Sequence, residues 1–440
     1  MIQEQKLKAW IVTADMGYGH QRGVHPLEDI AETGIITVGQ NDSSNVDEKK
    51  LWKQLLEGYE FFSRARSIPV IGKFLFGILD ALLHIPSYYP IRDLSDSTMQ
   101  VETLQKFIKN GLCRGMMNKI SSNDLPMVTS FYAPAIAADV KGYNKIYCII
   151  CDADINRVWV AKHPWDSRVN YFVPCGKAAQ RLKAYGVPEE RILLTGFPLH
   201  KSLLGDENLS ILKSDLGQRL VNLDPSGRFM HLYGKSVEHF LGEENLNCKK
   251  RDRLTITYAV GGAGALKEIG GKIAKSLKFK LLNGNVKLIL VAGIRPEVKK
   301  YFEQIIEKLG CNENSIEIIY DTDKYKYFEK FNNAIRRTDI LWTKPSELSF
   351  YCGLGLPIII APAIGSQEVF NKKWLFEINV GIKQENPDFS DQWLFDMLNS
   401  GRLAESAWNG FLKSRKLGVF KIQEVLNTGK YMGNESYVFR

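Results

Sequence analysis

A histidine follows two glycines directly after the first strand that we expect in this chain. The strand covers residues 8–14, and the loop after it contains Gly17, Gly19 and His20. Paired glycines let a backbone turn tightly and approach a ligand, and the first amides of a following helix attract anions. An imidazole can take a proton from a hydroxyl group near neutral pH. The pattern indicates a general base, His20, in a ligand-binding loop; a hydrogen-bonded structural histidine is the alternative.

A second glycine-rich loop follows the first strand of a later block that begins at residue 253. It contains Gly261, Gly262, Ala263 and Gly264. Backbone amides without side chains around them can cradle a diphosphate, whereas the alternative is a tight strand-to-helix turn without a ligand. The spacing is not G-x-G-x-x-G, and no acidic residue ends a clear next strand. A nicotinamide enzyme is therefore disfavoured.

Polar side chains also follow two strands near the end of this block. One group comes after the strand 338–344 and the other after the strand 356–362. Lysine, serine, glutamate, glutamine and asparagine at strand ends can hold a ribose, a diphosphate and a sugar. The candidates for this donor site are Lys344, Ser346, Glu347, Ser366, Gln367, Glu368 and Asn371.

The elements that must position these residues form two blocks of alternating strands and helices, each opened by a glycine-rich turn. This alternation predicts an α/β fold with two Rossmann-like domains, in which ligands bind at the carboxyl ends of the strands and in the cleft between the domains. The six strands expected in the first block are 8–14, 35–38, 126–131, 144–152, 171–175 and 191–196. We expect an N-terminal domain over 1–200, a linker or insert over 201–252, a C-terminal domain over 253–400 and a helical segment over 401–440.

The segment 59–92 is rich in Phe, Ile, Leu and Tyr, with Arg64, Arg66, Lys73 and Arg92 among them. Such a segment can lie in a bilayer interface, with its apolar face in the membrane and its basic side chains at the phosphates. A pair of helices packed in the N-terminal core is the alternative.

The composition gives a net charge of +9 over 440 residues, which indicates an anionic partner. Only this charge favours nucleic acid as the partner, because no nucleic-acid-binding motif is visible. We therefore expect that the chain does not bind nucleic acid.

The seven cysteines are irregularly spaced, and Cys148 and Cys151 lie in a buried strand pattern, so we expect reduced structural thiols and a cytoplasmic protein. No signal-peptide pattern and no apolar stretch of the ~18–20 residues that span a bilayer is present.

The motifs as a set resemble the diacylglycerol glycosyltransferase family typified by monogalactosyldiacylglycerol synthase, which is related to the peptidoglycan GlcNAc transferase. The family's opening G-x-G-H is matched by Gly17, Gly19 and His20. Its middle motif is similar to CDAD at 151–154 and YFVPCGKAAQRLKAYGVPEERILLTGFP at 171–198. Its donor motif is similar to TKPS, GLP and GSQE…N, which end in Gln367, Glu368 and Asn371. The resemblance covers most of the chain except 200–252 and the last forty residues.

One position departs from the family pattern. The family places a ribose-binding glutamate five residues before the glycine of GLP, and Phe350 stands there in this chain. Glu347 lies one helical turn earlier on nearly the same face. The glycine pair that usually follows the family's lysine is replaced by Pro345, Ser346 and Glu347.

The resemblance implies the GT-B architecture and a glycosyltransferase that uses a nucleotide diphosphate sugar, UDP-linked as in the family, and a lipid or lipid-linked acceptor. His20 or Asp152 would take the acceptor proton. The aspartates 152 and 154 have D-x-D spacing but fall in the acceptor domain, so we expect no metal and no cofactor beyond the co-substrate. We expect a peripheral enzyme on the anionic inner face of the cytoplasmic membrane. The alternatives are a sugar-nucleotide epimerase and a catalytically silent GT-B-fold binding protein.

Overall fold

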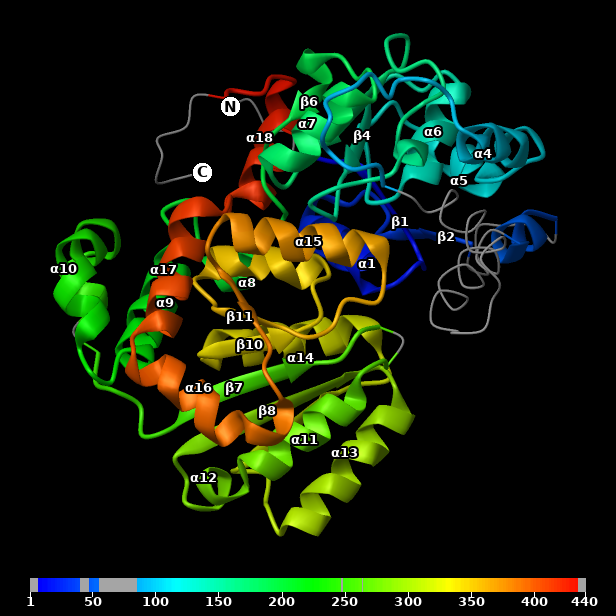
Figure 1. The fold of residues 1–440 in the computed structure, drawn as a ribbon. Helices are drawn as coiled ribbons and strands as arrows, with labels where there is room; N and C mark the ends of the chain where they lie inside the picture. The colour runs from blue at the N-terminus through cyan, green and yellow to red at the C-terminus, as the bar shows by residue number, and fades with distance from the viewer. Residues whose placement is uncertain (1–6, 40–46, 55–84, 247, 263, 434–440) are drawn as a thin grey trace, which may run out of the picture. The chain divides into compact units, whose positions relative to one another are not determined.

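A computed structural model describes residues 7–39, 47–54, 85–246, 248–262 and 264–433 (Figure 1). The chain divides into two compact units. Unit 1 contains Met1–Pro198, Ile364–Asn371 and Leu417–Glu435, and unit 2 contains Leu199–Ala363 and Lys372–Lys416. The short segment 364–371, which the sequence places within the second block, makes its contacts with unit 1.

Unit 1 is built on a six-stranded parallel sheet with the order β2-β1-β3-β4-β5-β6. Strands β1 and β3 are buried along their whole length, as expected for a parallel sheet covered on both faces. The strands are β1 (Trp10–Ala14), β2 (Ile36–Val38), β3 (Met127–Thr129), β4 (Ile146–Ile149), β5 (Val169–Phe172) and β6 (Ile192–Leu193). Every strand expected in this block is present, and β5 begins two residues earlier than the expected 171–175 because Val169 already pairs with Ile146.

The helices of unit 1 alternate with these strands and include one from the end of the chain. They are α1 (Tyr18–Val24), η1 (His25–Ile30), α4 (Met99–Lys109), α5 (Arg114–Ile120), α6 (Tyr132–Val140), η2 (Arg157–Trp159), α7 (Gly176–Ala184), η3 (Glu189–Arg191) and α18 (Gly418–Thr428). Figure 1 shows α18 beside β6. A Cβ atom on Gly418 would stand 2.5 Å from the Phe197 carbonyl oxygen, so this close approach requires glycine. The Tyr431 hydroxyl also donates to the Leu194 carbonyl at 2.7 Å.

Unit 2 holds a second six-stranded parallel sheet with the order β12-β11-β10-β7-β8-β9. Its strands are β7 (Leu254–Ala259), β8 (Val286–Gly293), β9 (Ile316–Tyr320), β10 (Ile340–Thr343), β11 (Ile358–Ile360) and β12 (Gly381–Lys383). The edge strand β12 is missing from the sequence-based expectation, because three residues carry too little periodicity to indicate a strand. The helices are α8 (Lys201–Leu204), α9 (Ser210–Leu223), α10 (Arg228–Leu241), η4 (Glu243–Asn245), α11 (Lys267–Ser276), α12 (Lys278–Leu282), α13 (Pro296–Leu309), α14 (Lys324–Arg337), η5 (Glu347–Leu354), η6 (Pro387–Phe389), α16 (Ser390–Asn399) and α17 (Arg402–Lys413). Helix α15 (Ser366–Glu377) begins in unit 1 and ends in unit 2.

The segment 201–252 is part of unit 2 and is attached to its sheet by buried polar contacts. The Arg219 guanidinium on α9 donates to the Thr338 carbonyl at 2.8 Å and to the Leu354 carbonyl at 2.6 Å. Asn222 donates to Asp339 at 2.9 Å, and the same carboxylate accepts the Thr255 amide of β7 at 2.8 Å. These bonds fix α9 at the amino ends of β7 and β10.

Candidate functional site

His20 lies at the carboxyl end of the unit 1 sheet, in the first turn of α1. Gly17 precedes the helix with φ +105°, a conformation that favours glycine. The His20 Nδ1 atom lies 2.7 Å from the Ser130 carbonyl oxygen. Because a carbonyl only accepts, Nδ1 carries the hydrogen, and Nε2 is the acceptor in the neutral ring. The rings of Phe131 and Trp159 pack against the imidazole with centroids at 4.9 Å and 5.9 Å.

Helix α1 approaches the loop after β4 closely enough to require glycine. A Cβ atom on Gly23 would stand 2.9 Å from Cys151 Sγ and 3.5 Å from Ser130 Cβ. His20 and Gly23 are three residues apart and therefore share a helix face. This face brings His20 to the loop that carries Asp152, the next residue after Cys151.

Asn371 holds this loop from the segment 364–371. Its side-chain oxygen accepts the Ala153 amide at 2.7 Å, and its Nδ2 donates to Asp152 Oδ1 at 2.8 Å. Asn371 is completely buried. The structure thus gives Asn371 direct contacts with the Asp152 loop, and the helix that carries His20 packs against the same loop through Gly23.

Asp154, two residues further on, has a structural environment. Its carboxylate accepts two hydrogen bonds from the buried Arg181 guanidinium, at 2.7 Å and 2.9 Å. Burial raises the pKa of Asp154, and the Arg181 hydrogen bonds oppose that rise. Arg181 also donates to the Pro86 carbonyl at 2.7 Å. Asp152 and Asp154 therefore differ in environment, and the second of them ties β4 to α7.

Glu368 is engaged at the start of α15. Its Oε2 atom accepts the amides of Ile364 at 2.6 Å and Gly365 at 3.3 Å. These hydrogen bonds resemble one half of a capping box, in which a glutamate in the first turn accepts the backbone amide of the residue before the helix. Ser366 and Gln367 lie in the same first turn.

The glycine loop of unit 2 follows β7, and the side chain of Lys344, which follows β10, lies across this loop. A Cβ atom on Gly261 would stand 2.5 Å from Lys344 Cε and 3.1 Å from Nζ. The Gly264 amide donates to the Gly261 carbonyl at 2.7 Å, and Gly264 has φ +74°. Helix α11 begins only at Lys267, so the amides of Gly261, Gly262 and Gly264 belong to the loop before the helix. Ala263 lies outside the described residues.

Arg295 is a second cation at this loop, and the sequence analysis missed it. It follows the carboxyl end of β8, and its Nε donates to the Gly262 carbonyl at 2.9 Å. A basic residue directly after a strand in an α/β domain is a signal that could have identified it. Lys344 and Arg295 therefore both contact the loop 261–264, which suits an anionic group.

The residues after Lys344 begin a 3₁₀ helix. Ser346 caps it, with Oγ accepting the Leu348 amide at 3.4 Å. Residues three apart eclipse one another in a 3₁₀ helix, so Glu347 lies in line with Phe350. The Phe350 ring packs against Trp374 with centroids 5.0 Å apart and is 1% exposed. Phe350 is a core residue at the position where the resemblance implies a ribose-binding glutamate.

The membrane segment expected at 59–92 is described only from residue 85 onward. In that part Tyr89 is 68% exposed and Ile91 is 80% exposed, and Met99 at the start of α4 is 74% exposed. The Lys177 ammonium lies 4.8 Å from the centre of the Tyr88 ring.

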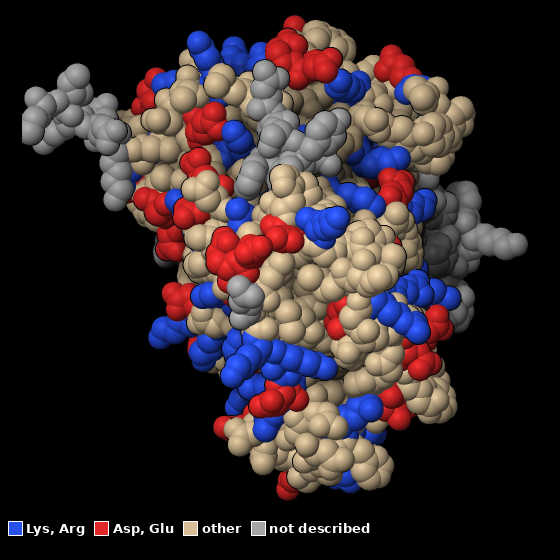
Figure 2. Space-filling view, turned by 90° about the vertical axis from the view of Figure 1, so that its left-hand side faces the viewer, with Lys and Arg blue, Asp and Glu red and all other residues tan. Residues whose placement is uncertain are grey.

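Among the described helices, none is both long enough and apolar enough to cross a bilayer. On the face shown in Figure 2, Lys and Arg side chains alternate with Asp and Glu.

Comparison with known proteins gives the fold. A family model described as a domain of unknown function, DUF6938, matches residues 295–421. No curated protein matches the chain. A Listeria monocytogenes protein assigned as a UDP-N-acetylglucosamine 2-epimerase is 13% identical, with 96% of each chain covered and a TM-score of 0.50. The UDP-GlcNAc 2-epimerase of Neisseria meningitidis is 11% identical over 96% of this chain and 99% of its own, with a TM-score of 0.49. MurG of Acinetobacter baumannii is 13% identical over 95% and 99%, with a TM-score of 0.46.

The two parallel six-stranded sheets, together with this likeness over nearly the whole chain, define the GT-B fold. The α/β, GT-B architecture expected from the sequence is therefore confirmed.

Proposed function

We propose that this chain is a glycosyltransferase that moves a sugar from a nucleotide diphosphate sugar, UDP-linked, to a lipid or lipid-linked hydroxyl acceptor at a membrane surface. The orientation of His20 carries the proposal. Its Nδ1 is bound to the Ser130 carbonyl at 2.7 Å, which leaves Nε2 as the proton acceptor. A histidine fixed in this tautomer suits a general base for a hydroxyl nucleophile.

The proposed step is a single displacement that begins with proton transfer to Nε2 of His20. The acceptor oxygen forms a bond to the anomeric carbon, and the bond from that carbon to the diphosphate oxygen breaks. The electron pair of that bond leaves with the nucleoside diphosphate. Asp152 is the second candidate for the base, and Asn371 fixes its position through the 2.8 Å hydrogen bond.

The donor would bind at the loop 261–264 of unit 2. Lys344 and Arg295, which both contact this loop, would balance the diphosphate charge. Gly261 and Gly262 have no side chains of their own to obstruct their amides, whereas the Gly264 amide already donates to the Gly261 carbonyl. Among the remaining polar candidates, Ser346 and Glu347 of the same unit would hold ribose and sugar hydroxyls. Glu368 supports the turn before α15, because its carboxylate accepts the amides of Ile364 and Gly365.

The membrane part of the proposal is supported by the exposed side chains at the end of the 59–92 segment. Tyr89 and Ile91 are large side chains exposed in this segment, and Met99, which lies beyond it at the start of α4, is exposed as well. Aromatic and aliphatic side chains beside cations such as Lys177 suit the headgroup region of an anionic bilayer. We place the enzyme on the cytoplasmic face of the membrane, where its nucleotide-sugar donor would be available.

A thermal-shift panel with UDP, GDP, CDP, ADP and dTDP tests the donor. A ligand that binds only the folded chain raises Tm, and we expect a rise with UDP that Lys344→Gln abolishes. No shift with any nucleotide at millimolar concentration would contradict the proposal.

We further expect transfer of labelled sugar to a lipid extract to continue in EDTA, because Lys344 and Arg295 would supply the positive charge.

Vesicle binding tests the membrane contact. We expect the chain to sediment with vesicles that contain phosphatidylglycerol, and Ile91→Asp to weaken this binding. Phe279→Asp is the matched control, since Phe279 is 78% exposed on α12 of unit 2. Equal loss of binding in both variants, or no binding by the unaltered chain, would count against a specific membrane surface at Ile91.

A sugar-nucleotide epimerase is the second candidate, and the fold likeness to the Listeria protein assigned as such an enzyme favours it. An epimerase would convert its sugar nucleotide without an acceptor, which proton NMR of the anomeric region detects. A silent binding protein would bind nucleotide but show neither reaction, and His20→Ala would leave that binding unchanged.

A further inference from the structure

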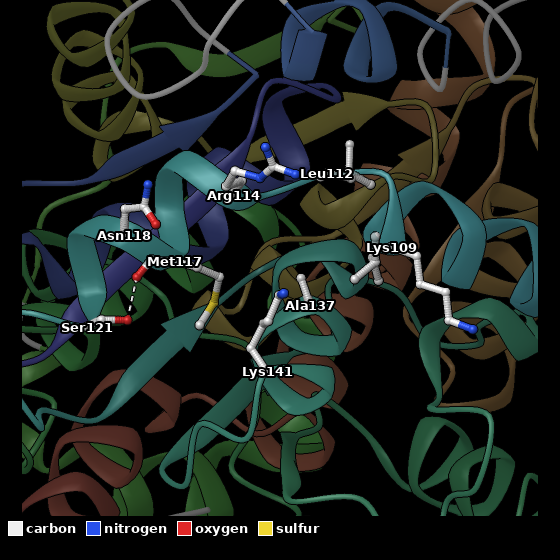
Figure 3. A pocket seen from close by; sticks show the side chains of 10 residues that line it. Lys109, Leu112, Arg114, Met117, Asn118, Ser121, Ala137 and Lys141 are labelled. Carbon is white, nitrogen blue, oxygen red and sulfur yellow. Dashed lines mark hydrogen bonds between the residues drawn. The ribbon is translucent and has the colours of Figure 1, made fainter.

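A hollow on unit 1 lies between α4, α5 and α6. Helix α6 starts just after Ser130, at the carboxyl end of β3, and runs back along the sheet to Val140. The hollow lies along the second half of this helix, at Ala137 and Lys141, which are about 8 Å and about 13 Å from the helix start at 1.5 Å per residue. It has a volume of about 430 Å³, within the range of small-molecule sites. The residues around it are Ile108, Lys109, Gly111, Leu112, Arg114, Met117, Asn118, Ser121, Ala137 and Lys141 (Figure 3).

The turn between α4 and α5 fixes one cation at the rim. Gly111 has φ +107°, and a Cβ atom there would stand 3.0 Å from Arg114 Nη2 and 3.1 Å from Cζ. The guanidinium therefore lies against the Gly111 backbone, where a side chain would crowd it. Cys113, with φ +64°, completes the turn. The Gly115 amide that follows donates to Glu48 at 2.8 Å, which anchors the start of α5.

The hollow combines an apolar floor with three basic side chains. Ile108 and Leu112 are each 2% exposed and Ala137 is 1% exposed, so they form a buried apolar floor. Figure 3 shows Lys141 reaching between Met117 and Ala137, with Arg114 and Lys109 at the edge. In the described part of the chain, no carboxylate forms an ion pair with Lys109, Arg114 or Lys141. Arg114 and Lys141 place like charges beside the same hollow, and a bound anion would relieve their repulsion.

We propose that this hollow binds a phosphomonoester that carries an apolar group. The phosphate would lie between Arg114 and Lys141, with Lys109 adding charge and Asn118 and Ser121 adding polar contacts. Guanidinium and ammonium groups are the usual partners of phosphate. The apolar group would cover Met117, Leu112 and Ala137. The site uses none of the residues of the proposed transfer reaction and does not depend on it.

Calorimetric titration of the full chain with phenyl phosphate tests the site. Saturating UDP occupies the loop 261–264, so that phenyl phosphate does not bind there. A second titration in the Lys344→Gln variant, which lacks one cation of that loop, serves the same purpose. We expect millimolar or tighter binding, at least threefold weaker binding of inorganic phosphate, and a loss of tenfold or more in Arg114→Gln/Lys141→Gln. Lys119→Gln is the control, because Lys119 is exposed on α5 but does not line the hollow.

A second arm identifies the source of the phosphate. Vesicles with and without phosphatidic acid are sedimented with the same variants, and unchanged thermal melts show that the substitutions leave the fold intact. Binding of phenyl phosphate supports a soluble ligand, whereas loss of vesicle binding in the double variant alone supports a lipid headgroup. Equal affinity of the unaltered chain and the double variant for both probes, or binding of neither probe, would overturn the proposal.

Discussion

The Lys344 side chain lies across the backbone of Gly261, so closely that a Cβ atom at position 261 would stand 2.5 Å from Lys344 Cε. The two residues end neighbouring strands, β7 and β10, which pair in parallel with Thr343 opposite Ala259. Pairing of the strands therefore places the glycine and the lysine in one loop region, and glycine at position 261 allows the ammonium to lie at the loop amides.

Gly261→Ala should displace the Lys344 ammonium and weaken UDP binding. A lost charge-assisted hydrogen bond corresponds to about 1.5–3 kcal/mol, so we expect an increase in Kd on the order of tenfold or more. Calorimetric titration measures it. Gly234→Ala is the control, because Gly234 lies in α10 with only Met230 Cε nearby, at 3.9 Å. An unchanged Kd in Gly261→Ala would show that Lys344 does not meet the nucleotide.

Asn371→Asp should disturb the Asp152 loop while keeping the size of the side chain. The new carboxylate can still accept the Ala153 amide, but it cannot donate to Asp152 and faces it as a like charge. We expect a loss of about 1–3 kcal/mol in the free energy of unfolding and a lower transfer rate. Denaturant unfolding checks the first effect, with the exposed Asn333→Asp as control. Equal stability of the two variants would argue against the clamp.

His20→Gln should lower kcat and leave nucleotide binding unchanged. A glutamine amide can still donate to the Ser130 carbonyl but cannot accept a proton from a hydroxyl group. General base catalysis contributes about 10²–10⁴-fold, and we expect a loss in kcat of that order. His231→Gln, an exposed position on α10, is the comparison. A kcat that is unaffected by His20→Gln would move the role of base to Asp152.

Phe350→Glu should destabilise unit 2 and should not improve UDP binding. The ring packs on Trp374 and is 1% exposed, so a carboxylate there would be buried without an arranged partner. Truncation of a buried phenylalanine alone costs about 3–5 kcal/mol, and we expect a loss of at least that size in thermal or urea unfolding. Phe279→Glu on the exposed face of α12 should cost much less. Tighter UDP binding by a stable Phe350→Glu chain would refute this assignment of Phe350 to the core.

Unit 2 should lose stability in acid through Glu317. Hydrogen bonds from Arg337 lower the pKa of Glu317 to about 2, from an ordinary value of 4.5. Because the folded pKa is lower than the unfolded one, this stabilisation is complete above about pH 4.5 and is lost as the pH falls to about 2. Glu317→Gln should therefore be less stable at pH 7, and its difference from the unaltered chain should shrink towards pH 2. The exposed Glu313→Gln should show a constant small difference across the same range.

Much of this architecture is contained in local sequence patterns. Apolar runs such as those at 8–14 and 286–293 predict buried strands, and glycines after them predict turns, because side-chain periodicity and backbone freedom are properties of neighbouring residues. The α/β alternation followed from them, as did the positions of most strands. The helical segment expected over 401–440 contains α17 and α18, which end at Lys413 and Thr428.

The contacts that define the candidate site depend on tertiary structure. Asn371 meets Asp152 across 219 residues of chain, and Arg295 meets Gly262 only because β7 and β8 are adjacent. Whether Phe350 is a ligand or a core residue is decided by Trp374 packed against it. The sequence alone determined which residues could do chemistry and which strands would carry them. Which of them meet was decided by the parallel order of the strands and by close packing, because pairing between distant segments leaves no local periodic signal.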